Sequence, residues 1–173
     1  NLNIVDGKQP TYRPMQAFTF KSGTETTSCS EIPQDGLIIQ TPEGAGEVQL
    51  WINQVVVKLG STVFFQAQPA GDMVVTTLEG HATVEAMGVS HTAVAGSSVN
   101  IKLDENMNAI SAPGLPQAYD MSFVQLLPID NLQREITIHL PLTPDEVISV
   151  QQAQTAAPVI ANNDNAGNSD TCP

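Results

Sequence analysis

The chain has 173 residues, of which 41% are apolar and 5% aromatic, and 6 Lys and Arg oppose 18 Asp and Glu for a net charge of −12. This length fits one domain with tails, and the apolar share suffices for a core of Val, Ile, Leu and Ala. The acidic surface argues against nucleic acid and anionic lipid as partners, and no apolar run is long enough to span a bilayer.

The first part of the chain, residues 1–30, lacks clear periodicity and is interpreted as an extended N-terminal arm. Asn1–Val5 and Ala17–Phe20 are each short and apolar enough to form a strand. Between the second of these and the rest of the chain, Ser22–Ser28 is a loop rich in Ser and Thr.

The centre of the chain, from Gly36 to Leu103, predicts a β meander. Val48, Leu50 and Ile52 alternate with polar or aromatic neighbours, which is typical of a half-buried strand. Turn signals such as Asn53-Gln54 recur about every eight to twelve residues, the spacing expected of a sandwich or barrel. The expected strands cover residues 37–40, 48–52, 55–59, 62–67, 73–78, 81–86, 92–95 and 99–103.

After the meander, the chain from Asp104 to Leu142 is looser and is punctuated by prolines. Phe123–Leu127 and Glu135–Leu140 are rich in apolar and β-branched residues, so they predict two further strands. We expect these strands to complete a β domain that covers residues 31–142.

A short helix is predicted over residues 143–154. Thr143 suits the N-cap, Pro144 the first helical position, and Asp145 and Glu146 the first turn. Residues 155–173 are a low-complexity tail rich in Ala, Asn, Asp and Gly. The sequence therefore predicts a mainly β chain: an antiparallel β-sandwich, jelly-roll-like or β-roll domain with one short C-terminal helix and extended tails.

The two cysteines, Cys29 and Cys172, both lie between polar neighbours in the flanks of the chain. A buried structural thiol is usually surrounded by apolar residues, so we expect these cysteines to form a disulfide in an oxidising compartment. A bond within one chain is favoured, and a bond between subunits is the alternative. Two cysteines without a neighbouring His do not make a tetrahedral metal site.

No motif for catalysis, metal binding or a cofactor is found, so no catalytic or metal-ligating residue is assigned. A shared face for His81 and His91 is conceivable, but no third ligand accompanies them. Ser97-Ser98 lacks the pattern of a nucleophile elbow. The tail segment Asn162–Asp170 lacks two of the ligand positions of an EF-hand, which leaves only weak Ca²⁺ binding by the acidic surface open.

Two sets of residues are candidates for an interface. Trp51, Phe64 and Phe65 are candidates for an exposed binding patch, and an outward-facing Trp51 is either an interface anchor or part of the core of a second sheet. The segments 1–5 and 155–160 are candidate strand donors to a neighbouring subunit. Within these two segments, the candidate interface residues are Asn1, Leu2, Ile4, Val159 and Ile160.

Three segments of the meander resemble the FecR-like domain of bacterial secreted and surface proteins. They are Val56–Thr62, Met73–Val84 and Ala93–Val99, and the L-E-G-x-A-x-V pattern at Leu78–Val84 is their most specific part. This resemblance implies a β-sandwich or β-roll domain outside the cytoplasm, and the family supplies no catalytic motif.

The resemblance extends through Leu115–Asp120 and Leu132–Ile138 and covers roughly Glu31 to Val147. In this longer run the chain is similar to extracellular proteins of filamentous, Chloroflexota-like bacteria that carry the domain. Since the chain starts at Asn1 and not at Met, we expect either that a signal peptide has been removed or that the chain begins within a longer protein.

The favoured function is that of a non-enzymatic extracellular structural or assembly protein. It would be a self-associating subunit of a filament, sheath or surface layer, with strand or tail exchange between copies. The alternative is a monomeric extracellular binding or sensing module of FecR type. An enzyme on a β scaffold is the weakest of the three hypotheses, because no acid, base or nucleophile constellation is evident.

Overall fold

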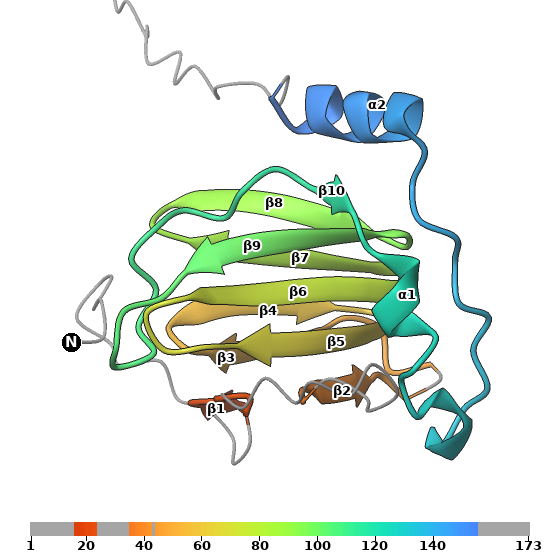
Figure 1. The fold of residues 1–173 in the computed structure, drawn as a ribbon, viewed down its shortest axis with the longest axis horizontal. Helices are drawn as coiled ribbons and strands as arrows, with labels where there is room; N and C mark the ends of the chain where they lie inside the picture. Colours follow the sequence, from red (N-terminus) through yellow and green to blue (C-terminus); the bar gives the residue numbers. More distant parts are fainter. Residues whose placement is uncertain (1–15, 24–34, 43, 156–173) are drawn as a thin grey trace, which may run out of the picture.

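The computed structural model describes residues 16–23, 35–42 and 44–155. They form a mainly β fold in which two five-stranded sheets pack face to face (Figure 1), and this confirms the predicted fold class. Sheet A has the strand order β1-β3-β4-β7-β8, and sheet B has the order β10-β9-β6-β5-β2. The strands are β1 (Ala17–Phe18), β2 (Leu37–Gln40), β3 (Val48–Ile52), β4 (Val55–Leu59), β5 (Thr62–Ala67), β6 (Asp72–Glu79), β7 (His81–Ala86), β8 (Val89–Val94), β9 (Ser97–Lys102) and β10 (Gln117–Ala118).

Successive hairpins alternate between the two sheets. The β3–β4 and β7–β8 hairpins belong to sheet A, whereas the β5–β6 hairpin between them belongs to sheet B. Neighbouring strands are antiparallel throughout, except that β1 runs parallel to β3. The chain thus winds around one core as a series of hairpins that belong alternately to the two sheets of the sandwich.

The hairpin turns lie at one end of the sandwich, and the crossings between the sheets lie at the other. Asn53 and Gln54 have φ values of 51° and 64°, the left-handed conformation that a two-residue hairpin turn requires. At the opposite end, the crossings contact one another: the Ser61 hydroxyl donates to the carbonyl of His81, at 2.9 Å. Gly80 belongs to this stack, because a Cβ at its position would come within 2.6 Å of the Ser61 side chain.

The main core lies between the sheets and is built from the inward residues of the alternating strands. Val63, Phe65 and Ala67 of β5 point inward and are fully buried. On the facing sheet, Val55, Val57 and Leu59 of β4 do the same. This period of two is the one that the hydrophobic pattern of the sequence predicts.

A second hydrophobic cluster covers the outer face of sheet B. Phe64 and Leu78 project from this face and pack against Tyr119, Val124 and Leu127. These last three belong to residues 119–142, here called the strap, which includes the helix α1 (Met121–Val124) and the 3-10 turn η1 (Ile129–Asn131). The strap is tied to the sandwich by backbone bonds, from the amide of His139 to the carbonyl of Leu78 (3.2 Å) and from Leu142 to Gly96 (3.0 Å).

The two strands predicted within the strap are wrong. Residues 121–124 are helical, because the Asp120 side chain caps the helix by accepting from the backbone amide of Ser122 at 2.8 Å. Residues 135–140 are extended, and Ile136 and Ile138 alternate with exposed neighbours, but no strand forms there. This segment crosses the face of sheet B and not its edge, so its backbone does not continue a ladder.

The helix α2 (Pro144–Thr155) confirms the predicted C-terminal helix. Thr143 and Glu146 form a reciprocal cap: the Thr143 amide donates to the Glu146 carboxylate at 2.7 Å, and the Glu146 amide donates to the Thr143 hydroxyl at 3.4 Å. This backbone contact holds the pKa of Glu146 below its ordinary value. The helix lies across the rim of the sandwich above β8 (Figure 1).

Candidate functional site

The rim beneath α2 is the first candidate site, because sheet A ends there with its edge strand β8. The backbone amide of Thr92 in β8 donates to Oε1 of Gln154, at 2.9 Å, and Nε2 of Gln154 donates to the carbonyl of Thr92, at 2.8 Å. One side-chain amide thus satisfies both backbone groups of one strand residue. A neighbouring strand would make the same two bonds, so Gln154 takes the place of one residue of a further strand.

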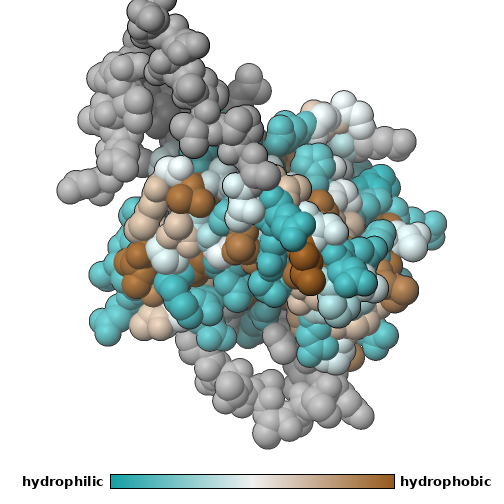
Figure 2. All heavy atoms as spheres, turned by 90° about the horizontal axis from the view of Figure 1, so that it is seen from above, coloured by the Kyte–Doolittle hydropathy of each residue, from teal (hydrophilic) through white to brown (hydrophobic). Residues whose placement is uncertain are grey.

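The inward stripe of α2 consists of Val147, Val150, Gln151 and Gln154, which follow the spacing of one helix face and are all half-buried. Gln151 adds a second polar contact by donating from Nε2 to the carbonyl of Pro116, at 2.8 Å. No residue of α2 is fully buried. Hydrophilic and hydrophobic residues are interspersed over this rim when it is viewed from the side of α2 (Figure 2). The helix is therefore attached by the half-buried Val147 and Val150 and by hydrogen bonds from two glutamine side chains.

The same device attaches two other peripheral segments. Asn53 pairs with Phe20: the Phe20 amide donates to Oδ1 at 2.9 Å, and Nδ2 donates to the Phe20 carbonyl at 2.8 Å. Gln40 pairs in the same way with the backbone of Arg134, at 3.0 and 2.8 Å. Each pair joins residues far apart in the sequence, so carboxamide side chains connect the N-terminal segment, the strap and α2 to the sandwich.

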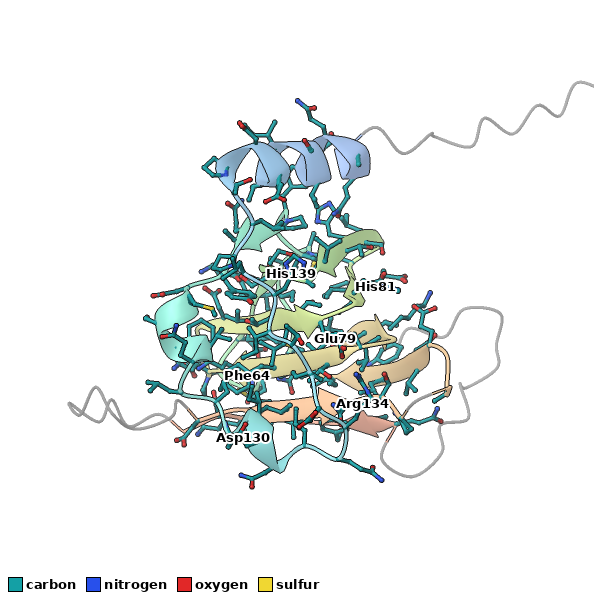
Figure 3. The ribbon with its side chains drawn as sticks, turned by 90° about the vertical axis from the view of Figure 1, so that its right-hand side faces the viewer. Phe64, Glu79, His81, Asp130, Arg134 and His139 are labelled. Carbon is teal, nitrogen blue, oxygen red and sulfur yellow. The ribbon has the colours of Figure 1, made fainter. Side chains whose placement is uncertain are left out.

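A second candidate site is an open hollow at the end where the chain crosses between the sheets, facing the viewer in Figure 3. Its volume is about 460 Å³, and its lining includes Thr41, Glu47, His81 and Arg134. Arg134 reaches Glu79 with both guanidinium nitrogens, at 2.9 and 2.6 Å. Both side chains of this pair are about one-third exposed. The lining thus includes Arg134, whose charge is compensated by Glu79 beside the hollow, together with the carboxylate of Glu47 and one histidine.

The ion pair with Arg134 controls the charge state of Glu79 beside the hollow. The hydrogen bonds from Arg134 hold the pKa of Glu79 below its ordinary value, against the smaller opposing effect of burial. Thr62 adds a third contact, since its hydroxyl lies 3.3 Å from the Glu79 carboxylate. Because Glu79 is ionised and already paired, it is poorly suited to accept a proton near neutral pH.

The aromatic interface residues predicted from the sequence do not form one exposed patch. Phe64 is 2% exposed and Phe65 is fully buried, because the strap covers the outer side of sheet B and sheet A covers its inner side. Trp51 differs, since it is half-buried on the outer face of sheet A, directly opposite Val56. Only Trp51 of this set keeps an accessible surface.

The remaining predicted site residues lie outside the described residues. These are the candidate disulfide partners Cys29 and Cys172 and the candidate strand-donor residues Asn1, Leu2, Ile4, Val159 and Ile160. Their pairing and exchange therefore stay predictions.

The histidines do not converge. His81 lies opposite Val94 on the outer face of sheet A, whereas His91 lies opposite Val84, whose side chain is in the core, so a shared face for the two is wrong. Nδ1 of His91 contacts the carbonyls of Pro113 and Gly114, each at 3.0 Å. Within the described ranges, no group of three or more His, Cys, Asp or Glu side chains is placed to hold a metal ion.

Sequence reasoning missed the pairing of Thr92 with Gln154. The residues are 62 positions apart, and neither belongs to a recognised motif. Two signals were present nonetheless: Val89–Val94 contains no charged residue or proline, and Gln151 and Gln154 are three positions apart on a predicted helix.

Comparison with protein-family models, with curated proteins and with solved structures finds no match to this chain. The resemblance to FecR-like domains therefore stays a prediction. In the part of the chain that the structure describes, no helix is long and apolar enough to cross a membrane.

Proposed function

We propose that this chain is a non-enzymatic extracellular structural protein that associates with further copies of itself, as a subunit of a filament, sheath or surface layer. The observation that carries the proposal is the character of β8. This edge strand has six residues, whereas the other described strands that end a sheet, β1, β2 and β10, have two, four and two. A long edge strand is a template for pairing with another chain.

Two usual protections of an edge strand, charged side chains and proline, are missing from β8, and its cover is the helix α2, held by Gln154. Its sequence, Val89–Val94, contains no Lys, Arg, Asp, Glu or Pro, and its pairing with β7 is continuous without a bulge. The short edges β1 and β10 are protected by their length, and Gln40 at the end of β2 is paired with the strap. The extracellular location is supported by the FecR-like segments and by the disulfide expected between Cys29 and Cys172.

Light scattering on the purified chain, with and without reductant and over a range of concentrations, tests this function. Self-association predicts a mass that rises with concentration above the 18.4 kDa of one chain. If the larger species persists in reductant, non-covalent contacts hold it together; if it dissociates, Cys29 and Cys172 link the subunits. A mass of one chain at every concentration contradicts the proposal.

A second candidate function is a monomeric binding or sensing module. The hollow lined by Thr41, Glu47, His81 and Arg134 favours it, since open concave sites with a few polar groups are typical of ligand binding. Calorimetric titration with a small-molecule ligand tests this function. If a monomeric chain binds the ligand saturably and substitution of His81 abolishes the binding, the result supports the binding module over the assembly protein.

A further inference from the structure

The orientation of the β8 backbone specifies how a second chain can join the sheet. Thr92 lies opposite Thr83 of β7, and their hydroxyls are 3.0 Å apart. Both backbone groups of Thr92 are directed at Gln154, so they point away from β7. Backbone direction alternates along a strand, so Ser90 and Val94 present their amides and carbonyls to the same side.

This arrangement is complementary to itself. If two β8 strands pair antiparallel about a two-fold axis beside Thr92, each Thr92 meets its own copy and each Ser90 meets a Val94. All these residues direct their backbone groups toward the partner, so they form the hydrogen-bonded pairs of an antiparallel ladder. Two five-stranded sheets would become one continuous sheet across the pair of molecules.

At the β8 edge, charge does not oppose a second copy as the occupant. The chain carries a net charge of −12, so two copies repel each other over most of their surfaces. The strand Val89–Val94 carries no formal charge, and its side chains on the outer face are those of Ser90, Thr92 and Val94. Two strands of this kind approach without placing like charges opposite each other.

The helix α2 must move for this pairing to occur, because Gln154 occupies the middle of the edge. Its attachment is suited to release: no residue of α2 is fully buried, and Ile148 on its outer side is 52% exposed. The contacts that must be broken are the hydrogen bonds of Gln154 with Thr92 and of Gln151 with Pro116, and the partial burial of Val147 and Val150. A partner strand replaces the two bonds made by Gln154 and adds those at Ser90 and Val94.

We propose that β8 is a self-association edge, that it pairs antiparallel with β8 of a second copy, and that α2 is a removable cover held over this edge by Gln154. The proposal rests on the self-association put forward as the function. It adds that β8 is the strand that pairs, that the pairing is centred on Thr92, and that α2 competes with the partner strand for this edge.

The test uses the full chain and sedimentation analysis of its association. Gln154→Ala removes the cover's two bonds to Thr92, so the dissociation constant of the dimer should fall at least tenfold. Gln152→Ala is the matched control, because Gln152 lies on the exposed side of the same helix and should leave the constant unchanged. Ser90→Lys places a cation on the edge and should weaken association at least tenfold, although it lowers the net negative charge.

A second variant and a second readout make the result independent of folding defects. Thr92→Pro removes the central outward amide and should abolish pairing in the Gln154→Ala background, with circular dichroism confirming a folded chain. If this variant does not fold, Ser90→Lys decides, because Ser90 is exposed in the single chain. In the associating protein, hydrogen exchange at Ser90 and Thr92 should slow as concentration rises.

The outcomes separate this inference from the proposed function. Association that Gln154→Ala and Ser90→Lys leave unchanged overturns the pairing through β8 and keeps self-association by another surface. A chain that is monomeric at every concentration, also as Gln154→Ala, overturns both. Tighter association of Gln154→Ala, with slowed exchange at Thr92, supports both.

Discussion

Phe64 and Phe65 are adjacent in the chain, yet their rings are buried on opposite faces of sheet B. Phe65 lies in the core between the two sheets, whereas Phe64 lies beneath the strap, with its ring centroid 6.1 Å from that of Phe123. A strand alternates its side chains between two faces, so both rings are buried only because both faces of β5 are covered.

We expect substitutions at these two positions to have different consequences. Phe65→Ala should lower the free energy of unfolding by about 3–5 kcal/mol, because it leaves a cavity in the shared core. It should shift the unfolding midpoint for every probe, including the fluorescence of Trp51 on sheet A. Denaturant titration followed by fluorescence and by circular dichroism measures both effects.

Phe64→Ala should act mainly on the strap. Hydrogen exchange should accelerate at Val124 and Leu127, which pack on the ring, by more than at Val57 in the main core. Equal acceleration in both regions would show that the strap and the sandwich unfold as one unit.

Asn53 is expected to be the most sensitive polar residue of the hairpin turns. It is 2% exposed, has a φ of 51°, and holds both backbone groups of Phe20. Asn53→Ala should destabilise the fold by about 2–4 kcal/mol, since it loses two hydrogen bonds and puts Ala in the left-handed region. Thermal and denaturant unfolding provide the measurement.

Asn53→Gly is the matched variant, because it keeps the backbone conformation and loses only the side-chain amide. We expect it to recover part of the stability lost in Asn53→Ala, but not all of it. A glycine variant as stable as the original chain would mean that the contact with Phe20 contributes nothing.

Gly80 should tolerate a side chain less well than Gly88, although both have positive φ values, 70° and 76°. A Cβ at Gly80 would lie 2.6 Å from the Ser61 side chain, whereas nothing lies within 4 Å at Gly88. Gly88→Ala should cost about 1–2 kcal/mol from backbone strain alone, and Gly80→Ala about 1–3 kcal/mol more from the clash. Equal losses of unfolding free energy in the two variants would contradict the close stacking of the crossings.

The ion pair between Glu79 and Arg134 should make stability depend on pH in the acid range. The folded chain holds the pKa of Glu79 below its ordinary value of 4.5, so the unfolded chain binds more protons there. The stabilisation from this ion pair is therefore fully present above pH 4.5 and is lost as the pH falls through the pKa of Glu79 in the folded chain. The difference in unfolding free energy between the original chain and Glu79→Gln should shrink on acidification.

The control for this titration is Glu105→Gln, which removes the same formal charge at an exposed position. The difference in unfolding free energy between Glu105→Gln and the original chain should change less with pH than the difference for Glu79→Gln. A Glu79→Gln difference that stays constant from neutral pH to acid pH would show that the contact with Arg134 does not lower the pKa in solution.

The sequence by itself determined the strands and turns of the meander, because these depend on local signals. Alternation from Val48 to Ile52 and the turn at Asn53-Gln54 were predicted at the positions where the structure has them. The C-terminal helix was predicted equally well, since Thr143 and Glu146 form its cap from residues three apart. Strand β8 was predicted to begin at Thr92, but pairing with β7 extends it back to Val89.

Only the tertiary structure decided what covers each face and each edge. Phe64 is buried because the strap, more than 50 residues further along the chain, crosses sheet B, and no pattern around Phe64 records this. The predicted strand at residues 123–127 failed for the same reason, since a segment lying across a face has no edge to pair with. The bond between Gln154 and Thr92 likewise exists only after two distant segments have been placed side by side, because a glutamine side chain takes its partner from whichever backbone the fold brings within reach.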